Sequence, residues 1–167
     1  MPNPFVSKLV REMKAVFGGD QKRIDHALAV LGFAEQILSA EGGDAEVILA
    51  AAVLHDIGIQ EAERKYGSSA GVYQELEGPP IAEEILRRQG VSEDRLEHVC
   101  KIVGNHHSAK SIDTAEFRAI WDADWLVNFL DIFPPGSGGD RMGSINRIFK
   151  TETGRQIALH LFAASQH

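Results

Sequence analysis

The sequence predicts an all-α fold, a single-domain helical bundle, from three observations. Its 167 residues suit one domain with a substantial hydrophobic core. Ala, Leu and Ile are abundant while aromatic residues make up only 7% of the chain, a balance that favours helix over sheet. Apolar residues recur with the period of amphipathic helices, and Gly and Pro separate the periodic segments.

The first third of the chain contains three predicted helices. Residues 5–17 and 23–40 each carry an apolar stripe, and each stripe stops at a Gly-Gly pair, as expected for a helix end. Asp44 is a suitable N-cap for the third helix, over residues 45–55. This helix is apolar nearly all round, which predicts that it is the buried central element.

The later helices are predicted between clear breaks. A short polar helix over residues 60–66 is followed by a Gly/Ser-rich loop that extends to Gly78. Pro79-Pro80 starts a fourth long helix, which ends before Gly90. Further helices are expected from Ser92 to His106 and His107, over 114–133, and, after a Pro/Gly loop at 134–139, over 141–149 and 154–164.

Charge and composition exclude several classes of partner. The formal charge of -7 argues against nucleic acid or an anionic membrane, which recruit clustered Lys and Arg. The longest apolar run, residues 47–54, is far shorter than a membrane span. The single cysteine, Cys100, cannot form an internal disulfide, and the amino terminus lacks the basic-then-apolar pattern of a secretion signal. We therefore expect a cytoplasmic protein with a small-molecule ligand.

Four residues stand out as candidates for metal ligation: His26, His55, Asp56 and Asp124. His55-Asp56 ends the most apolar helix, where a charged Asp is costly unless it is paired or bound to a cation. Asp124 lies within the apolar stripe of its helix, whereas Asp122 lies about 200° away, so Asp124 is the better ligand. A lone core His is usually hydrogen-bonded packing, but the combination favours a site for Mn, Fe, Co, Ni, Zn or Mg.

The order of these residues resembles the HD superfamily of metal-dependent phosphohydrolases, named for its His-Asp doublet. The matching segments lie within about residues 20–130, and the first and last helices are expected to pack on this core. These segments are Arg23-Ile24-Asp25-His26, Ala52-Val53-Leu54-His55-Asp56-Ile57-Gly58, Glu77-Gly78-Pro79-Pro80-Ile81-Ala82, Asn105-His106-His107-Ser108 and Asp122-Ala123-Asp124-Trp125-Leu126. The resemblance implies a phosphodiesterase-like helical fold and one divalent metal held by His26, His55, Asp56 and Asp124.

A second metal is implied by the binuclear members of that superfamily, in which further histidines act as ligands. Here Glu77 stands where those members have a His before Gly-Pro, and a carboxylate could still ligate a metal. His106 is the closer match to another of these histidines, and His107 is the near alternative. Both histidines could instead stabilise the dipole at a helix end.

The resemblance further implies the reaction: metal-bound water attacks a phosphate ester of a nucleotide or small phosphorylated metabolite, as a phosphomonoesterase or phosphodiesterase. By analogy, Asp56 also orients this water or accepts its proton. Arg23, three residues before His26 on the same helix, is a candidate for binding the substrate phosphate. Lys110 is a weaker candidate, and a solvated surface charge is the alternative for both cations.

Two other functions remain open. One is di-iron oxygenase-like chemistry on the same scaffold, which the substitution of Glu77 for His weakens. The other is a non-catalytic, ligand-sensing HD domain with a structural metal, against which the open coordination positions argue. The first helix and the C-terminal helix could also mediate a homodimer rather than pack on the bundle.

The segment 67–71 formally matches a G-x-S-x-G nucleophile motif, but no strand precedes it. Its position between the His-Asp doublet and the next long helix instead predicts a loop that covers the substrate. Trp121 and Trp125 are expected to pack in the core and at its rim. The possible substrate contacts in or near the loop are Tyr66, Tyr73 and Gln74.

Overall fold

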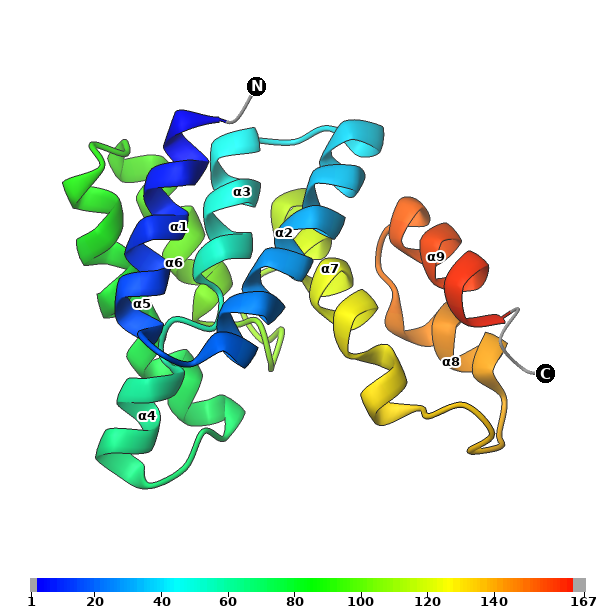
Figure 1. Cartoon of the computed structure of the whole chain (residues 1–167). Helices are drawn as coiled ribbons and strands as arrows, with labels where there is room; N and C mark the ends of the chain where they lie inside the picture. The colour runs from blue at the N-terminus through cyan, green and yellow to red at the C-terminus, as the bar shows by residue number, and fades with distance from the viewer. Residues whose placement is uncertain (1–2, 164–167) are drawn as a thin grey trace.

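The structure is a computed structural model that describes residues 3–163 (Figure 1). No strand occurs within these residues, which confirms the all-α prediction. None of their helices is long and apolar enough to cross a bilayer. The helices are α1 (Pro4–Phe17), α2 (Gln21–Glu41), α3 (Ala45–Leu54), α4 (Ile59–Tyr66), α5 (Gly71–Arg88), α6 (Glu93–Val103), α7 (Ala115–Ile132), α8 (Arg141–Ile148) and α9 (Glu152–Ala158), with a π-helical turn at Leu159–Ala163.

The helix α3 forms the centre of the bundle. Every residue from Val47 to Leu54 is buried, and Asp44 caps the helix by accepting a hydrogen bond from the Val47 N–H. The helices α1, α2, α6 and α7 pack around α3 (Figure 1). A helix surrounded in this way needs apolar residues on all sides, as its sequence has. The chain therefore delivers His55, directly after α3, into the interior.

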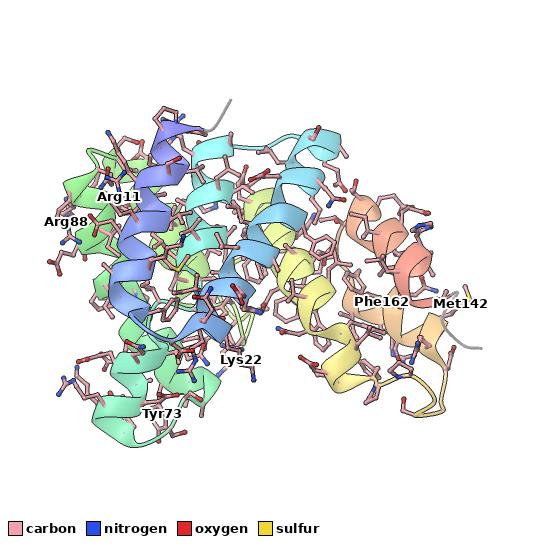
Figure 2. All side chains as sticks on the ribbon, viewed as in Figure 1. Arg11, Lys22, Tyr73, Arg88, Met142 and Phe162 are labelled. Atoms are coloured by element: carbon pink, nitrogen blue, oxygen red, sulfur yellow. The ribbon has the colours of Figure 1, made fainter. Side chains whose placement is uncertain are left out.

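The C-terminal helices cover the side of α7 that faces away from α3. The helix α9 packs against α7 and α2, and Phe162 stacks on Phe129 of α7 with ring centroids 4.4 Å apart. Side chains fill the space between these helices (Figure 2). α7 is therefore buried on two opposite faces. The predicted end of the last helix, Ala164, lies outside the described residues.

Two helix boundaries differ from the prediction. The helix α5 begins at Gly71 and continues through Pro79-Pro80, so the Gly/Ser-rich loop before it is shorter than expected. The turn after α3 packs closely against the middle of α5. A Cβ on Gly58 in that turn would lie 2.5 Å from the backbone nitrogen of Gly78 in α5. α6 ends at Val103, and the turn over residues 104–108 carries the two histidines that were expected on the helix.

Candidate metal centre

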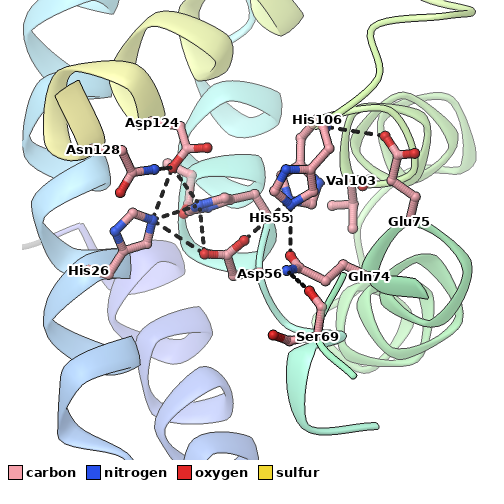
Figure 3. A network of polar contacts seen from close by, with 12 residues as sticks. His26, His55, Asp56, Ser69, Gln74, Glu75, Val103, His106, Asp124 and Asn128 are labelled. Atoms are coloured by element: carbon pink, nitrogen blue, oxygen red, sulfur yellow. Dashed lines mark hydrogen bonds and ion pairs between the residues drawn. The ribbon is translucent and has the colours of Figure 1, made fainter. Parts of the chain in front are cut away.

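Four side chains from three elements converge at one point in the bundle (Figure 3). They are His26 from α2, His55 and Asp56 from the end of α3 and the turn after it, and Asp124 from α7. The Nε2 atom of His26 lies 3.0 Å from Oδ1 of Asp124 and 3.3 Å from Oδ2 of Asp56. The Nε2 atom of His55 lies 3.5 Å from Oδ1 of Asp124 and 3.3 Å from Oδ2 of Asp56. The structure thus brings together the four residues singled out in the sequence.

The spacing of these atoms fits the ligands of a divalent metal. Ligands about 2.1 Å from a shared ion lie about 3.0 Å apart at right angles and about 3.4 Å apart at tetrahedral angles. The two Nε2 atoms of His26 and His55 also face each other at 3.3 Å. The Nδ1 atom of His55 lies 2.8 Å from the Ala52 carbonyl oxygen, to which an Nδ1–H group donates. A neutral His55 therefore directs the lone pair of Nε2 into the cluster.

Charges within the cluster keep both carboxylates ionised. Burial opposes ionisation of Asp56, but His55 and His106 outweigh it and hold its pKa well below the ordinary value. Burial likewise opposes ionisation of Asp124, whose pKa is lowered by hydrogen bonds from His26 and His55. Burial also disfavours the charged form of His55, yet the two carboxylates raise its pKa well above the ordinary value. A cation, whether a proton or a metal, is therefore strongly favoured between these groups.

A second group of ligand atoms adjoins the first. Asp56, His106 and His107 offer atoms within 4.8 Å of one another. The Oδ1 atom of Asp56 lies 3.2 Å from Nε2 of His106. The Nδ1 atom of His106 lies 2.7 Å from the Val103 carbonyl oxygen, to which an Nδ1–H group donates. His106 is buried whereas His107 is exposed. Asp56 therefore directs Oδ2 towards His26 and His55, and Oδ1 towards His106.

Two predicted site residues lie elsewhere. The Glu77 carboxylate is paired with the Lys65 ammonium group at 3.0 Å and accepts a hydrogen bond from the Tyr66 hydroxyl at 3.0 Å. It belongs to neither ligand group, so the structure gives no support to Glu77 as a second-metal ligand. Lys110 is exposed and does not line the cavity beside the cluster.

The cluster opens into a cavity of about 450 Å³. Arg23 lines this cavity, and its guanidinium is held by Asp20 at 2.9 Å and Glu63 at 2.5 Å. Lys22, the residue before Arg23 on α2, lines it too; Figure 2 labels its side chain. Of the residues expected to contact substrate from the loop side, Gln74 lines the cavity, whereas Tyr66 and Tyr73 are not among its lining residues.

Asn128 is a site residue that the sequence reasoning missed. Its Nδ2 atom donates to Oδ1 of Asp124 at 3.0 Å, and its side chain lines the cavity. The available signal was its spacing, because a residue four positions after Asp124 lies on the same face of the helix. His107 and Gln74 form a similar pair, in which Nε2 of His107 lies 2.9 Å from Oε1 of Gln74.

Asp122 requires a correction. Helical phase predicted that it lies away from the buried face of α7, but it is fully buried on the opposite side of the helix. Its carboxylate accepts hydrogen bonds from the N–H groups of Lys150 and Thr151 and from the Thr151 hydroxyl. The segment before α9 covers this face of α7 and supplies these donors. Asp122 therefore ties α7 to the C-terminal helices and takes no part in the cluster.

Comparisons with known proteins agree with this architecture. The model of the HD domain family matches residues 23–129. The fold is similar to the crystal structure of a predicted HD superfamily hydrolase from an uncultured Thermotogales bacterium, with a TM-score of 0.73 and 23% sequence identity over 96% of this chain and 87% of that chain. A comparison with curated proteins found no significant match. Because the family match spans more than half of the sequence and includes all four converging residues, the chain belongs to the HD domain family.

Proposed function

We propose that the protein is a divalent-metal-dependent phosphohydrolase that acts on a small phosphate ester. The observation that supports this most is the convergence of two imidazoles and two carboxylates beside a cavity that also contains an arginine. The residues that would hold the metal are His26, His55, Asp56 and Asp124. When bound, a divalent metal lowers the pKa of a coordinated water and polarises phosphate oxygens.

Arg23 and Asp56 have distinct roles in this proposal. The guanidinium of Arg23 shares the cavity with Asp56, and its fork of N–H donors matches the oxygens of a phosphate. The carboxylates of Asp20 and Glu63 hold that fork in place. Asp56 stays ionised because its pKa is lowered by its histidine neighbours despite burial, so it can accept a hydrogen bond from the attacking water and orient it.

The second ligand group favours one alternative. Asp56, His106 and His107 have the residue types for a second metal, and oxygen chemistry on a di-iron pair would need both groups filled. Oxygen uptake that depends on substrate would support that alternative, whereas hydrolysis needs no oxygen. Ligand binding without turnover would instead support a sensing role.

Phosphate release tests the proposal directly. Protein reconstituted with Mn, Fe, Co, Ni, Zn or Mg is incubated with nucleoside monophosphates, sugar phosphates and a synthetic diester, and inorganic phosphate or the released alcohol is measured. We expect turnover with at least one metal, a loss of at least about hundredfold in Asp56→Asn, and little change in Glu77→Gln. Protein that carries metal yet releases nothing from any of these esters would contradict the proposal.

A further inference from the structure

A second cavity adjoins the metal centre and differs in character from the first. Its volume is about 200 Å³. Both cavities are lined by His107, Asp124 and Asn128, so they meet at the cluster. The first cavity is rimmed by charged side chains from α2, whereas the second adds Trp121, Trp125 and Ile132, together with His106, to the three shared residues.

The geometry of α7 explains why apolar residues lie beside the cluster. At about 100° per residue, four positions of α7 lie within about 100° of Asp124 around the helix. One lies three residues before Asp124, and the others lie one, four and eight residues after it. These positions are Trp121, Trp125, Asn128 and Ile132. Besides the polar Asn128, the helix that supplies Asp124 therefore presents an apolar stripe of Trp121, Trp125 and Ile132 next to it.

The two tryptophans of this stripe are held differently. The indole N–H of Trp121 donates to the Ile148 carbonyl at 3.1 Å, and the Lys150 ammonium lies 4.8 Å from its ring centroid. Trp121 is thereby fixed as a wall. Trp125 is half-buried, and its ring lies beside that of Phe133, with centroids 6.4 Å apart. Its neighbour Ile132 is 55% exposed. Apolar surface of this kind beside a polar centre favours a ligand that covers it.

We propose that the second cavity binds the leaving group of the substrate and selects esters whose leaving group carries a flat, unsaturated ring, with Trp125 as the specificity-determining residue. This inference rests on the proposed phosphohydrolase function. An apolar cavity of about 150 Å³ is large enough for a benzene ring, so one ring fits a space of about 200 Å³. Because Asp124 lines both cavities, a ring against Trp125 leaves the phosphate beside the metal ligands and within the cavity that contains Arg23.

The test compares benzyl phosphate with ethyl phosphate, two esters of primary alcohols that differ by the ring. Trp125→Leu is expected to lower kcat/KM about tenfold for benzyl phosphate and to leave it within about twofold for ethyl phosphate, because stacking on an aromatic side chain is lost. Trp125→Phe is expected to retain most of the preference. The matched control is Tyr66→Leu, which removes a half-exposed aromatic ring outside both cavities. This variant is expected to leave kcat/KM unchanged for both esters.

Other outcomes overturn the inference. These are equal kcat/KM values for the two esters in the wild type, or an equal loss for both in Trp125→Leu. If Trp125→Leu does not fold, Ile132→Ala at the exposed end of α7 replaces it, with an expected selective loss of about threefold.

Binding measurements separate this inference from the proposed function. If the metal-loaded protein hydrolyses no ester, the proposed function fails, and benzylphosphonate and ethylphosphonate are titrated into it by calorimetry. Tighter binding of benzylphosphonate that is weakened about tenfold in Trp125→Leu supports the aromatic subsite. Equal binding of both phosphonates, or no binding of either, overturns it.

Discussion

Replacing Asp122 with Ala should destabilise the fold without removing the metal. The Asp122 carboxylate accepts hydrogen bonds of 2.8 Å from the Lys150 N–H, 2.7 Å from the Thr151 N–H and 2.7 Å from the Thr151 hydroxyl. A buried donor left without a partner costs about 1–3 kcal/mol. Thr151 is buried, whereas water reaches the exposed Lys150. Part of the loss is offset, because burial raises the pKa of Asp122 and so disfavours its ionised form. We expect a net loss of about 2–4 kcal/mol.

Urea unfolding of the metal-free protein, followed by circular dichroism, measures this loss. A loss of that size corresponds to a decrease in Tm of about 5–15 °C for a chain of this length. The matched control is Asp131→Ala, an exposed carboxylate on the same helix. The reasoning is refuted if Asp122→Ala changes the free energy of unfolding by less than about 0.5 kcal/mol, or if the folded variant no longer binds metal.

Further predictions concern two glycine substitutions, the pH dependence of metal affinity and the role of Glu77. Gly58→Ala should destabilise the protein by more than about 3 kcal/mol in urea unfolding, because its Cβ would lie 2.5 Å from the backbone nitrogen of Gly78; Gly32→Ala, with no atom within 4 Å, should stabilise it by up to about 1 kcal/mol. Metal affinity measured by titration should increase from about pH 6 to about pH 8. Neighbouring carboxylates raise the pKa of His55 despite burial, so the metal must displace a proton from this residue. A metal affinity that does not change with pH would contradict this. Glu77→Gln should leave the metal content unchanged in elemental analysis, because Glu77 belongs to neither ligand group; a lost equivalent would restore its role as a ligand.

Much of the helical fold could be predicted from local patterns. The apolar run after Asp44 predicted the central helix, because only a helix surrounded by others is apolar all round. The path of α5 through Pro79-Pro80 could not be predicted, because local preference places proline at a helix start. The close approach of Gly58 and Gly78 depends on tertiary packing, which these local rules do not include.

The candidate site shows the same division. Helical phase favoured Asp124 over Asp122 as the metal ligand, and Asp124 lies 3.0 Å from His26. The same reasoning treated α7 as a helix with one buried face. The C-terminal helices cover the opposite face, so Asp122 is buried as well. The resemblance of the sequence to a family drew attention to Glu77, but its pairing with Lys65 and Tyr66 depends on the packing of α4 against α5. No local pattern encodes that contact.

Metal content is the most direct test of the central claim, that the converging histidines and aspartates form a metal centre. Elemental analysis would compare the purified wild type with a double variant that carries His55→Ala and Asp56→Ala. The control is Asp131→Ala, because Asp131 lines the same cavity but belongs to neither ligand group. We predict about one equivalent of Mn, Fe, Co, Ni or Zn in the wild type and the control, or about two if the second group is also filled, and none in the double variant. A wild type that holds no metal after reconstitution, or a double variant that retains it, would contradict the account.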